Sequence, residues 1–377
     1  MTPTHTESAP QASGHAADLD RRVRELADSD IAQVGSVLRT QLADHAAVLT
    51  GVHPDLRPVS AVLARAGNRG KRLRASFCLW GARGATRGEL PPGATQIAAA
   101  VELFHLAALI HDDIMDHSDQ RRGLSTMHRH FADEHRHNSR IGDADAYGEA
   151  VAVLAGDLCL TWSDDILAEG TADLDRTTRR QVRRIFSVMR DEAIAGQFLD
   201  VDGQTHAVTS ATRAELVLRF KSAKYTISHP LRLGAAVAGA PADLLSAYDA
   251  IGIAAGEAFQ LRDDLLGVLG DPAVTGKPTI DDIREGKRTL LIAWAEENAD
   301  RIQRRVLDQH LGNPEVTHDG VWEVCEVLRD TGAVRRVENR IAELAAQSTE
   351  LIDASPVDDV TRHALAGLVA RCVWRAA

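Results

Sequence analysis

Strand-like alternation of polar and apolar residues is scarce along this chain, whereas long stretches carry the mixed polar and apolar pattern of helices. No proline occurs between Pro92 and Pro230, and this stretch is rich in Ala, Leu, Arg and Glu, which favour the α-helix. The pattern therefore predicts an all-α protein built from successive long helices. We expect helices over 96–118, 150–168, 176–202, 213–239, 242–270, 282–298 and 320–350.

The segment 96–118, QIAAAVELFHLAALIHDDIMDHS, begins almost wholly apolar and ends in a group of carboxylates. A helix that is apolar on every side is normally buried in the centre of a large bundle, so its acidic end must open onto something polar. Residues 1–18, mostly Ser, Thr, Pro, His, Ala and Gly, are typical of a disordered tail. Because no linker-like composition follows, we expect one all-α domain over 19–377.

Composition narrows the class of protein. The 377 residues carry a formal net charge of −11, which argues against a nucleic-acid partner because phosphate contacts need a surplus of basic residues. No secretory signal and no uncharged apolar run of transmembrane length is visible, so we expect a cytoplasmic protein. A reducing compartment also fits the wide spacing of the cysteines, which form no CxxC pair. They are Cys78, Cys159, Cys325 and Cys372.

Two acidic clusters carry the candidate chemistry. Asp112 and Asp116 are four residues apart, so on a helix they project from the same face, where their like charges repel. A hard divalent cation would remove that conflict, although a solvated helix end is the simpler alternative. A second cluster, Asp263-Asp264, follows another apolar helix, and basic groups stand around both. Carboxylates combined with Lys and Arg are the groups that bind Mg²⁺ and a diphosphate together.

Several segments in this order resemble the trans-isoprenyl diphosphate synthases of the polyprenyl synthetase family, most of all a bacterial geranylgeranyl diphosphate synthase. The resemblance covers about 60–290. It rests on GKRLR at 70–74, FHLAALIHDDIMDHSDQRRG at 104–123, GQFLD at 196–200, FKSAKYTISHPLRLGA at 220–235, FQLRDDLLGVLGD at 259–271 and GKPTIDDIREGKRT at 276–289. It implies a large single-domain helical bundle of the isoprenoid synthase type with a central cavity, and it implies a homodimer.

The resemblance also implies an activity and a set of residue roles. Isopentenyl diphosphate would be condensed with an allylic diphosphate (dimethylallyl, geranyl or farnesyl) by ionisation, attack and proton loss, with three Mg²⁺ ions when diphosphate is bound. Asp112, Asp116 and Asp263 match the metal ligands, and Asp200 matches a residue near them. The groups that match the allylic diphosphate site are Arg121, Lys221, Ser222, Gln260, Lys277 and Lys287. Those that match the isopentenyl diphosphate site are Lys71, Arg74, His105 and Arg122.

One departure concerns the second aspartate motif, which is DDxxD in the family. Gly267 occupies its last position here, and Asp271 follows later. We expect activity to persist with weaker metal binding on that wall. The substitution Gly267→Asp is therefore expected to strengthen the binding of Mg²⁺.

Product length is predicted from the helix that precedes the first motif. Ala108 and Phe104 share the face of Asp112, about 6 and 12 Å below it, and Ala107 lies beside Ala108. Two alanines leave the first level open, and Phe104 would form the floor. This predicts the C20 product geranylgeranyl diphosphate, with farnesyl diphosphate or a product of C25 or longer as alternatives.

Other functions compete with this hypothesis. A class I terpene cyclase usually has an Asn/Asp, Ser, Glu metal triad, which we do not find, and it needs no isopentenyl pocket. A silent partner subunit would have lost the aspartates, and a helical scaffold would not need the basic groups. The histidines of MHRHFADEHRH (His128, His130, His135 and His137) could hold zinc, but no cysteine accompanies them, so we expect a solvent-facing or lid segment.

Overall fold

The computed structural model describes residues 9–121, 123–270 and 280–374, which are almost entirely helical, as predicted. The first half comprises α1 (Ala9–Val52), the 3₁₀ helix η1 (Pro54–Leu56), α2 (Arg57–Gly67), α3 (Leu73–Thr86), α4 (Ala94–Met115), β1 (Gln120–Arg121), β2 (Leu124–Ser125), α5 (Met127–His137), α6 (Ala144–Gly170) and α7 (Arg176–Gln204). The two short strands pair antiparallel, with Gln120 opposite Ser125.

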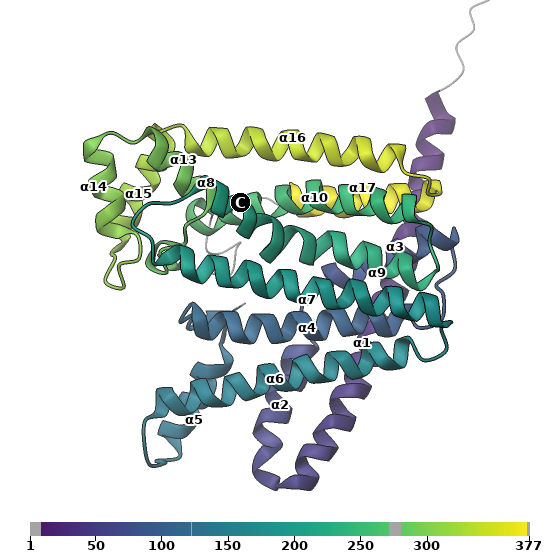
Figure 1. Ribbon diagram of the computed structural model, residues 1–377, viewed down its shortest axis with the longest axis horizontal. Coiled ribbons are helices and arrows are strands. Elements are labelled where there is room, and N and C mark those ends of the chain that lie inside the picture. Colours follow the sequence, from purple (N-terminus) through teal and green to yellow (C-terminus); the bar gives the residue numbers. More distant parts are fainter. Residues whose placement is uncertain (1–8, 122, 271–279, 375–377) are drawn as a thin grey trace, which may run out of the picture.

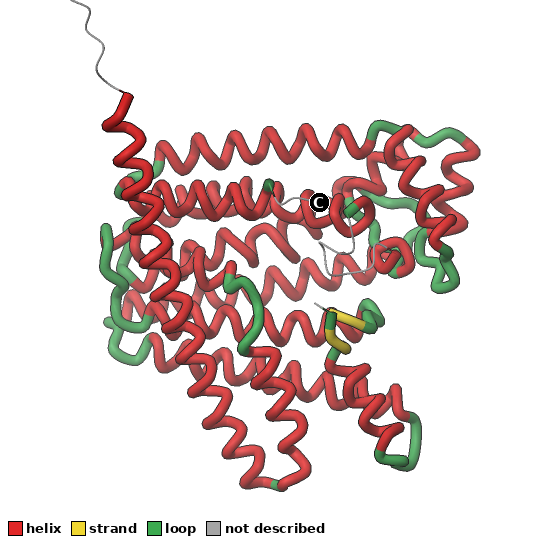
Figure 2. The backbone as a smooth tube through the Cα atoms, turned by 180° about the vertical axis from the view of Figure 1, so that it is seen from behind, coloured by secondary structure: helices red, strands yellow, loops and turns green. Residues whose placement is uncertain are grey.

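The second half continues the bundle. It comprises α8 (Ala211–Val217), the π-helix η2 (Leu218–Ser228), α9 (His229–Val237), α10 (Ala242–Leu269), α12 (Ile280–Arg284), α13 (Leu290–Asn298), α14 (Arg301–His310), α15 (His318–Asp330), α16 (Ala333–Ala354) and α17 (Asp359–Val373). The long helices α16, α10, α7, α4 and α6 run side by side across the molecule, and α1 crosses them at one side (Figures 1 and 2).

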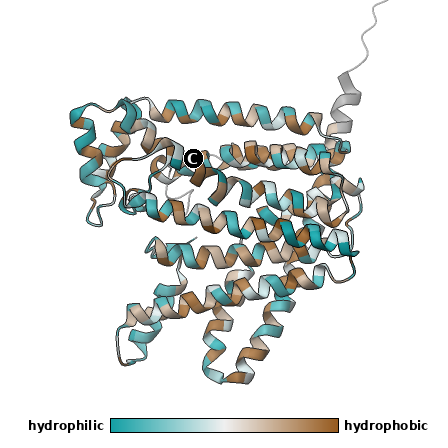
Figure 3. Cartoon of the chain, viewed as in Figure 1, coloured by the Kyte–Doolittle hydropathy of each residue, from teal (hydrophilic) through white to brown (hydrophobic). Residues whose placement is uncertain are grey.

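The segment with the acidic end forms α4, the central apolar helix. Ile97, Val101 and Phe104 are at most 2% exposed. By length and composition α4 is the one helix among the described residues that could cross a membrane, yet 61% of its most apolar window is buried inside the protein. Outer helices such as α16 instead show separate polar and apolar faces (Figure 3). The burial of α4 is the behaviour predicted for a core helix.

Four expectations about the elements are corrected. The predicted tail over 1–18 is wrong from Ala9 onward, because α1 begins there; residues 1–8 lie outside the described residues. The helix expected over 213–239 is divided into α8, η2 and α9, since Pro230 in the first turn of α9 cannot donate a backbone hydrogen bond. The helix expected over 320–350 ends at Asp330 and restarts after Gly332, whose φ of 75° suits glycine. The segment 282–298 likewise forms two helices, α12 and α13.

Small residues and buried ion pairs hold the helices in place. A Cβ atom at Gly81 would lie 2.2 Å from the backbone oxygen of Leu231, and one at Gly234 would lie 1.7 Å from that of Cys78, so α3 and α9 cross almost in backbone contact. Arg83 on α3 donates to buried Asp30 on α1 at 2.6 and 2.9 Å. These contacts position α3, and through it the segment 70–74 that precedes it.

Candidate active site

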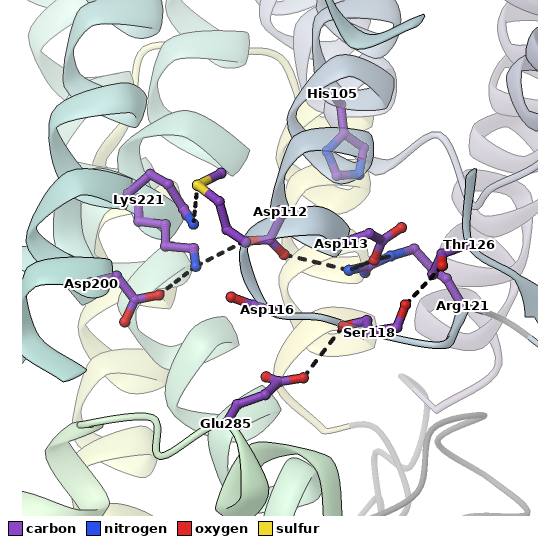
Figure 4. Close-up of polar contacts among 12 residues, drawn as sticks. His105, Asp112, Asp113, Asp116, Ser118, Arg121, Thr126, Asp200, Lys221 and Glu285 are labelled. Atoms are coloured by element: carbon purple, nitrogen blue, oxygen red, sulfur yellow. Dashed lines mark hydrogen bonds and ion pairs between the residues drawn. The ribbon is translucent and has the colours of Figure 1, made fainter. Parts of the chain in front are cut away.

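Three carboxylates stand at the C-terminal end of α4, and Figure 4 shows them facing residues of β1, α7 and η2. The carboxylates are those of Asp112, Asp113 and Asp116, the last of which caps the helix with its N–H bonded to the carbonyl of Asp112. The C-terminal end of a helix already carries partial negative charge, so acidic side chains there are unfavourable unless cations compensate them. The local structure of α4 therefore requires positive groups from elsewhere in the chain.

Two cations from other elements meet the first of these carboxylates. Lys221 of η2 places its Nζ 3.2 Å from Asp112 Oδ1 and 2.5 Å from Asp200 Oδ2 on α7. Arg121 of β1 donates from Nε to Asp113 Oδ1 at 2.6 Å and lies 3.4 Å from Asp112 through Nη2. Residues that are distant in sequence thus converge on α4 as predicted, although Asp113 was not among the expected contacts.

A third cation comes from the segment after α12. Lys287 Nζ lies 3.4 Å from Asp116 Oδ2, 3.1 Å from Asp282 Oδ1 and 2.8 Å from Glu285 Oε2. Ser118 Oγ donates to the other Glu285 oxygen at 3.3 Å. Burial opposes the charge of Lys287, but Asp282 and the other carboxylates outweigh it and raise its pKa well above the usual value. Asp282 and Glu285 therefore lie at the site. Their place in the sequence, between Lys277 and Lys287, predicted either water-mediated metal contacts or solvated charge.

The two aspartates of the first motif differ in their electrostatics. Burial alone would raise the pKa of Asp112, yet Lys221 and Arg121 outweigh it and hold that pKa well below the usual range. For Asp116, burial and then repulsion from Asp112 raise the pKa, against the opposing effect of Lys287. The cations of the chain itself therefore leave Asp116 incompletely compensated.

The residues present fit a hard divalent cation. Asp116 Oδ1 is buried and accepts no hydrogen bond from any described group, and carboxylate oxygens are the ligands that Mg²⁺ prefers. Within the described ranges, however, no three His, Cys, Asp or Glu side chains are grouped closely enough to hold a metal alone. Mg²⁺ commonly completes its octahedron with water and phosphate oxygens. The site is thus suited to a metal that arrives with a diphosphate.

The second wall is α10, which packs closely on η2. A Cβ at Gly256 would lie 2.6 Å from the Cα of Ala223. On this wall Asp263 is exposed, and Gln260 Nε2 donates to Asp264 Oδ1 at 2.8 Å. Burial raises the pKa of Asp264 to about 7. Gln260 thus contacts Asp264, and its role toward diphosphate stays a prediction.

The residues expected at the isopentenyl site gather around Tyr225 of η2. Arg74 Nη2 donates to Thr226 Oγ1 at 2.8 Å, and its guanidinium lies 4.3 Å from the centre of the Tyr225 ring. The Tyr225 hydroxyl is hydrogen-bonded to His105 Nδ1 at 2.8 Å. The sequence contained Tyr225 within FKSAKYTISHP, but its central place between Arg74 and His105 was missed because it depends on how η2 meets α4.

Two further predicted site residues lie within the described part of the chain. Lys71 is exposed in the loop before α3, and Ser222 is half-buried beside Lys221 on η2. Arg122, Lys277 and Asp271 lie outside the described residues. The expected roles of all these residues therefore stay predictions.

Three aromatic rings pack together on α4, α7 and η2, about two helical turns before the first motif. Phe104 is buried and contacts Phe186 of α7 and Tyr225 of η2 edge-on, with ring centroids 6.3 and 5.7 Å apart. Asp112 faces the same two elements through Lys221 and Asp200, so the predicted alignment of Phe104 with Asp112 is present in the structure. Ala108 lies between them on this face. Ala107 is fully buried and lies one turn before His111, whose ring is bonded to Val153 of α6.

The histidine-rich segment forms α5, which packs on α6. His128 and His135 are each 4% exposed, so the expectation of a solvent-facing segment is wrong for these two. Their rings are bonded to Thr126 Oγ1 at 3.3 Å and to the backbone oxygen of Ile141 at 3.2 Å. In the part of the chain that the structure describes, they form no metal site.

The chain is similar to known proteins along most of its length. A family model described as polyprenyl synthetase matches residues 58–328. The crystal structure of a geranylgeranyl pyrophosphate synthase from Corynebacterium glutamicum, complexed with isoprenyl diphosphate and magnesium, is similar at 36% identity and a TM-score of 0.86, covering 91% of this chain and 99% of the other.

Curated relatives differ in the product that their names give. A geranylfarnesyl diphosphate synthase from Aeropyrum pernix is 33% identical over 84% of this chain and 93% of its own length. A (2E,6E)-farnesyl diphosphate synthase from Mycobacterium tuberculosis is 29% identical over 78% of this chain and 76% of its own.

Proposed function

Because this chain belongs to the polyprenyl synthetase family and is a trans-prenyl diphosphate synthase, we propose that its product is the C20 compound geranylgeranyl diphosphate. The observation that carries this proposal is the aromatic group of Phe104, Phe186 and Tyr225 beneath the first aspartate motif. Phe104 lies eight residues before Asp112, which is about 12 Å along a helix. Two extended five-carbon units, each about one helical turn long, span this distance. With its first unit at the level of the diphosphate and Asp112, a C15 acceptor fits above the floor, and further growth is hindered.

The roles of the charged residues follow from their contacts. We assign Asp112, Asp116 and Asp263 to three Mg²⁺ ions that bind with the diphosphate, in a family that depends on magnesium. When bound, Mg²⁺ stabilises the negative charge of the departing diphosphate. Lys221 and Lys287 lie 3.2 and 3.4 Å from aspartates of the first motif. Their ammonium groups are therefore already held where phosphate oxygens would arrive.

Arg121 completes the allylic side of the site. It is fixed by Asp113, which accepts from its Nε at 2.6 Å, so its guanidinium needs little reorganisation to face a phosphate. Arg74 and His105, held around Tyr225, would receive isopentenyl diphosphate. We place Arg122, Lys71, Ser222, Gln260 and Lys277 among the substrate contacts on the family resemblance.

The proposed activity also predicts the location and the oligomeric state of the protein. We infer a cytoplasmic enzyme that forms a homodimer. Exposed apolar side chains on α6 and α7 support a second copy as the partner, with Leu154, Ile194 and Phe198 between 60% and 68% exposed. Apolar groups gathered on neighbouring helices are typical of a surface that another subunit covers.

One assay tests the function. The enzyme is incubated with Mg²⁺, an allylic diphosphate and labelled isopentenyl diphosphate, and the products are separated by chromatography. A linear C20 diphosphate supports the proposal, while a C15 or C25 product would correct its chain length. A hydrocarbon without incorporated label would instead indicate a terpene cyclase, and no turnover would indicate a silent subunit.

A further inference from the structure

A buried glutamate on α4 has no part in the proposed chemistry. Glu102 is 7% exposed and lies three residues before His105 on the same helix. A carboxylate that is buried needs donors or cations to compensate it. Glu102 Oε1 accepts from the backbone N–H of Ala75 at 2.9 Å, and Oε2 lies 3.5 Å from Arg72 Nη1. Both partners belong to the start of α3, so Glu102 ties that start to α4.

Arg72 has an unusual backbone for a residue with a side chain. It directly precedes α3 with a φ of 52° and a ψ of 38°, in the left-handed region that favours glycine. Its side chain is buried nonetheless, and Nη2 donates to the carbonyl of Gly67 at the end of α2. A strained conformation of this kind persists where the surrounding structure holds it. The Arg72 side chain, fixed at Glu102 and Gly67, therefore holds the turn between α2 and α3.

The same turn sets the place of Arg74, in the first turn of α3. Arg74 lies over the ring of Tyr225, 4.3 Å from its centre, and the Tyr225 hydroxyl is bonded to His105 at 2.8 Å. Arg74 and His105 come from different helices, so they meet at Tyr225 only if the start of α3 is held against α4. The bond from Ala75, the residue after Arg74, to Glu102 holds it there.

Glu102 is remote from the metal end of α4. It lies ten residues before Asp112, which is about 15 Å along a helix. The cations that meet Asp112 are Lys221 and Arg121, and they come from η2 and β1 rather than from the segment 70–74. A change at Glu102 is therefore expected to affect the isopentenyl side and to leave the metal and the allylic diphosphate in place.

We propose that Glu102 is a positioning residue for isopentenyl diphosphate. Its carboxylate fixes the turn from which Lys71 and Arg74 face that substrate, and it does not touch the substrate itself. Groups that are held in place before a ligand arrives bind it at a lower entropic cost. Loss of the Glu102 carboxylate therefore weakens the binding of one of the two substrates. The inference rests on the proposed function, which requires this substrate.

The test is steady-state kinetics with Mg²⁺, in which isopentenyl diphosphate and farnesyl diphosphate are varied in turn. Glu102→Ala is expected to raise the KM for isopentenyl diphosphate about 10-fold and to change kcat and the KM for farnesyl diphosphate much less. Glu102→Gln keeps an oxygen for the Ala75 N–H but offers no charge to Arg72, so its rise should be smaller. Glu257→Ala is the matched control, since Glu257 of α10 is 5% exposed and pairs with Arg219 at 2.8 Å. It should lower the Tm and leave the KM for isopentenyl diphosphate unchanged.

Arg72→Gly separates the effect of the Arg72 side chain from that of its backbone. Glycine adopts the left-handed conformation without strain, so this variant removes the guanidinium and leaves the turn accessible. We expect Arg72→Gly to raise the KM for isopentenyl diphosphate as well. The double variant Arg72→Gly/Glu102→Ala should be little worse than Glu102→Ala, because both changes release the same segment.

A folded Glu102→Ala with the wild-type KM for isopentenyl diphosphate would overturn the inference, and so would an equal rise in the KM of both substrates. The Tm of each variant identifies misfolding, and if Glu102→Ala does not fold, Glu102→Gln and Arg72→Gly decide in the same way. If the wild type does not incorporate labelled isopentenyl diphosphate, the proposed function fails first. If the wild type does so and the folded variants keep its KM, only this inference fails.

Discussion

We propose that single residues decide the length of the product. Phe104 is 2% exposed and meets two further aromatic rings, so its side chain is both a structural group and the proposed end of the space for the growing chain. Ala108, one turn closer to Asp112, leaves that space open. The same face of α4 thus carries the proposed metal ligand at one end and the proposed stop at the other.

Removal of the floor should lengthen the product. We predict that Phe104→Ala shifts the main product from C20 to C25 or longer on chromatography, and that it lowers stability by about 3–5 kcal/mol because a buried aromatic is truncated. Phe131→Ala is the matched control, since Phe131 is equally buried but belongs to α5. It should cost similar stability and leave the product unchanged. A C20 profile from folded Phe104→Ala would exclude Phe104 as the floor.

At the scale of elements, close helix crossings place the site residues. Gly81 and Gly234 let α3 and α9 meet almost at backbone distance. The segment 70–74 leads into α3, and η2 leads into α9. The relative position of Arg74 and Thr226, which are bonded at 2.8 Å, therefore depends on this crossing.

A methyl group at the crossing should disturb both stability and substrate binding. We predict that Gly234→Ala lowers the free energy of unfolding by about 1–3 kcal/mol through overpacking, measured by urea denaturation, and that it raises the KM for isopentenyl diphosphate. Gly51→Ala is the control, because nothing lies within 4 Å of a Cβ there. That substitution should be neutral or stabilise the helix by up to about 1 kcal/mol. Equal stabilities for the two variants would contradict the packing account.

A helix could be predicted from the sequence where the residue pattern of that segment alone determines it. The apolar helix expected over 96–118 is α4 (Ala94–Met115), and the i,i+4 placement of Asp112 and Asp116 holds. The division of 213–239 was not predicted, because the bonding pattern of the π-helix η2 depends on its packing against α7 and α10. Gly332 likewise lies inside the helix expected over 320–350, although its left-handed conformation separates α15 from α16.

The same limit of prediction from sequence applies to the site residues. The resemblance supplied Asp112, Lys221 and Lys287, which the structure does bring together. It could not show that Tyr225 lies between Arg74 and His105, or that Glu102 contacts the start of α3. Both contacts depend on how distant helices meet, which residue spacing does not encode.

At the scale of the whole molecule, the exposed apolar side chains of α6 and α7 indicate an assembly. We predict that the wild type sediments at about twice the 40.7 kDa chain mass and that Phe198→Asp shifts it toward the monomer, because a charge buried at an interface is costly. Val52→Asp, at a similarly exposed position at the end of α1, should leave the dimer intact. A monomeric wild type would refute the homodimer, and a dimeric Phe198→Asp would place the interface elsewhere.

The protein has a net charge of −11, and yet its proposed substrates are anionic diphosphates. This is possible because Lys221, Lys287 and Arg121 are focused at the aspartates of α4, and Mg²⁺ would add the remaining positive charge. Condensation is therefore expected to depend on the metal and to end at the aromatic floor.

The most direct test is product analysis of the wild-type enzyme with farnesyl diphosphate, labelled isopentenyl diphosphate and Mg²⁺. We predict that the label appears in a linear C20 diphosphate and little of it in longer chains, and that no product forms when EDTA removes the metal. Absence of incorporated label, or incorporation that persists in EDTA, would contradict it.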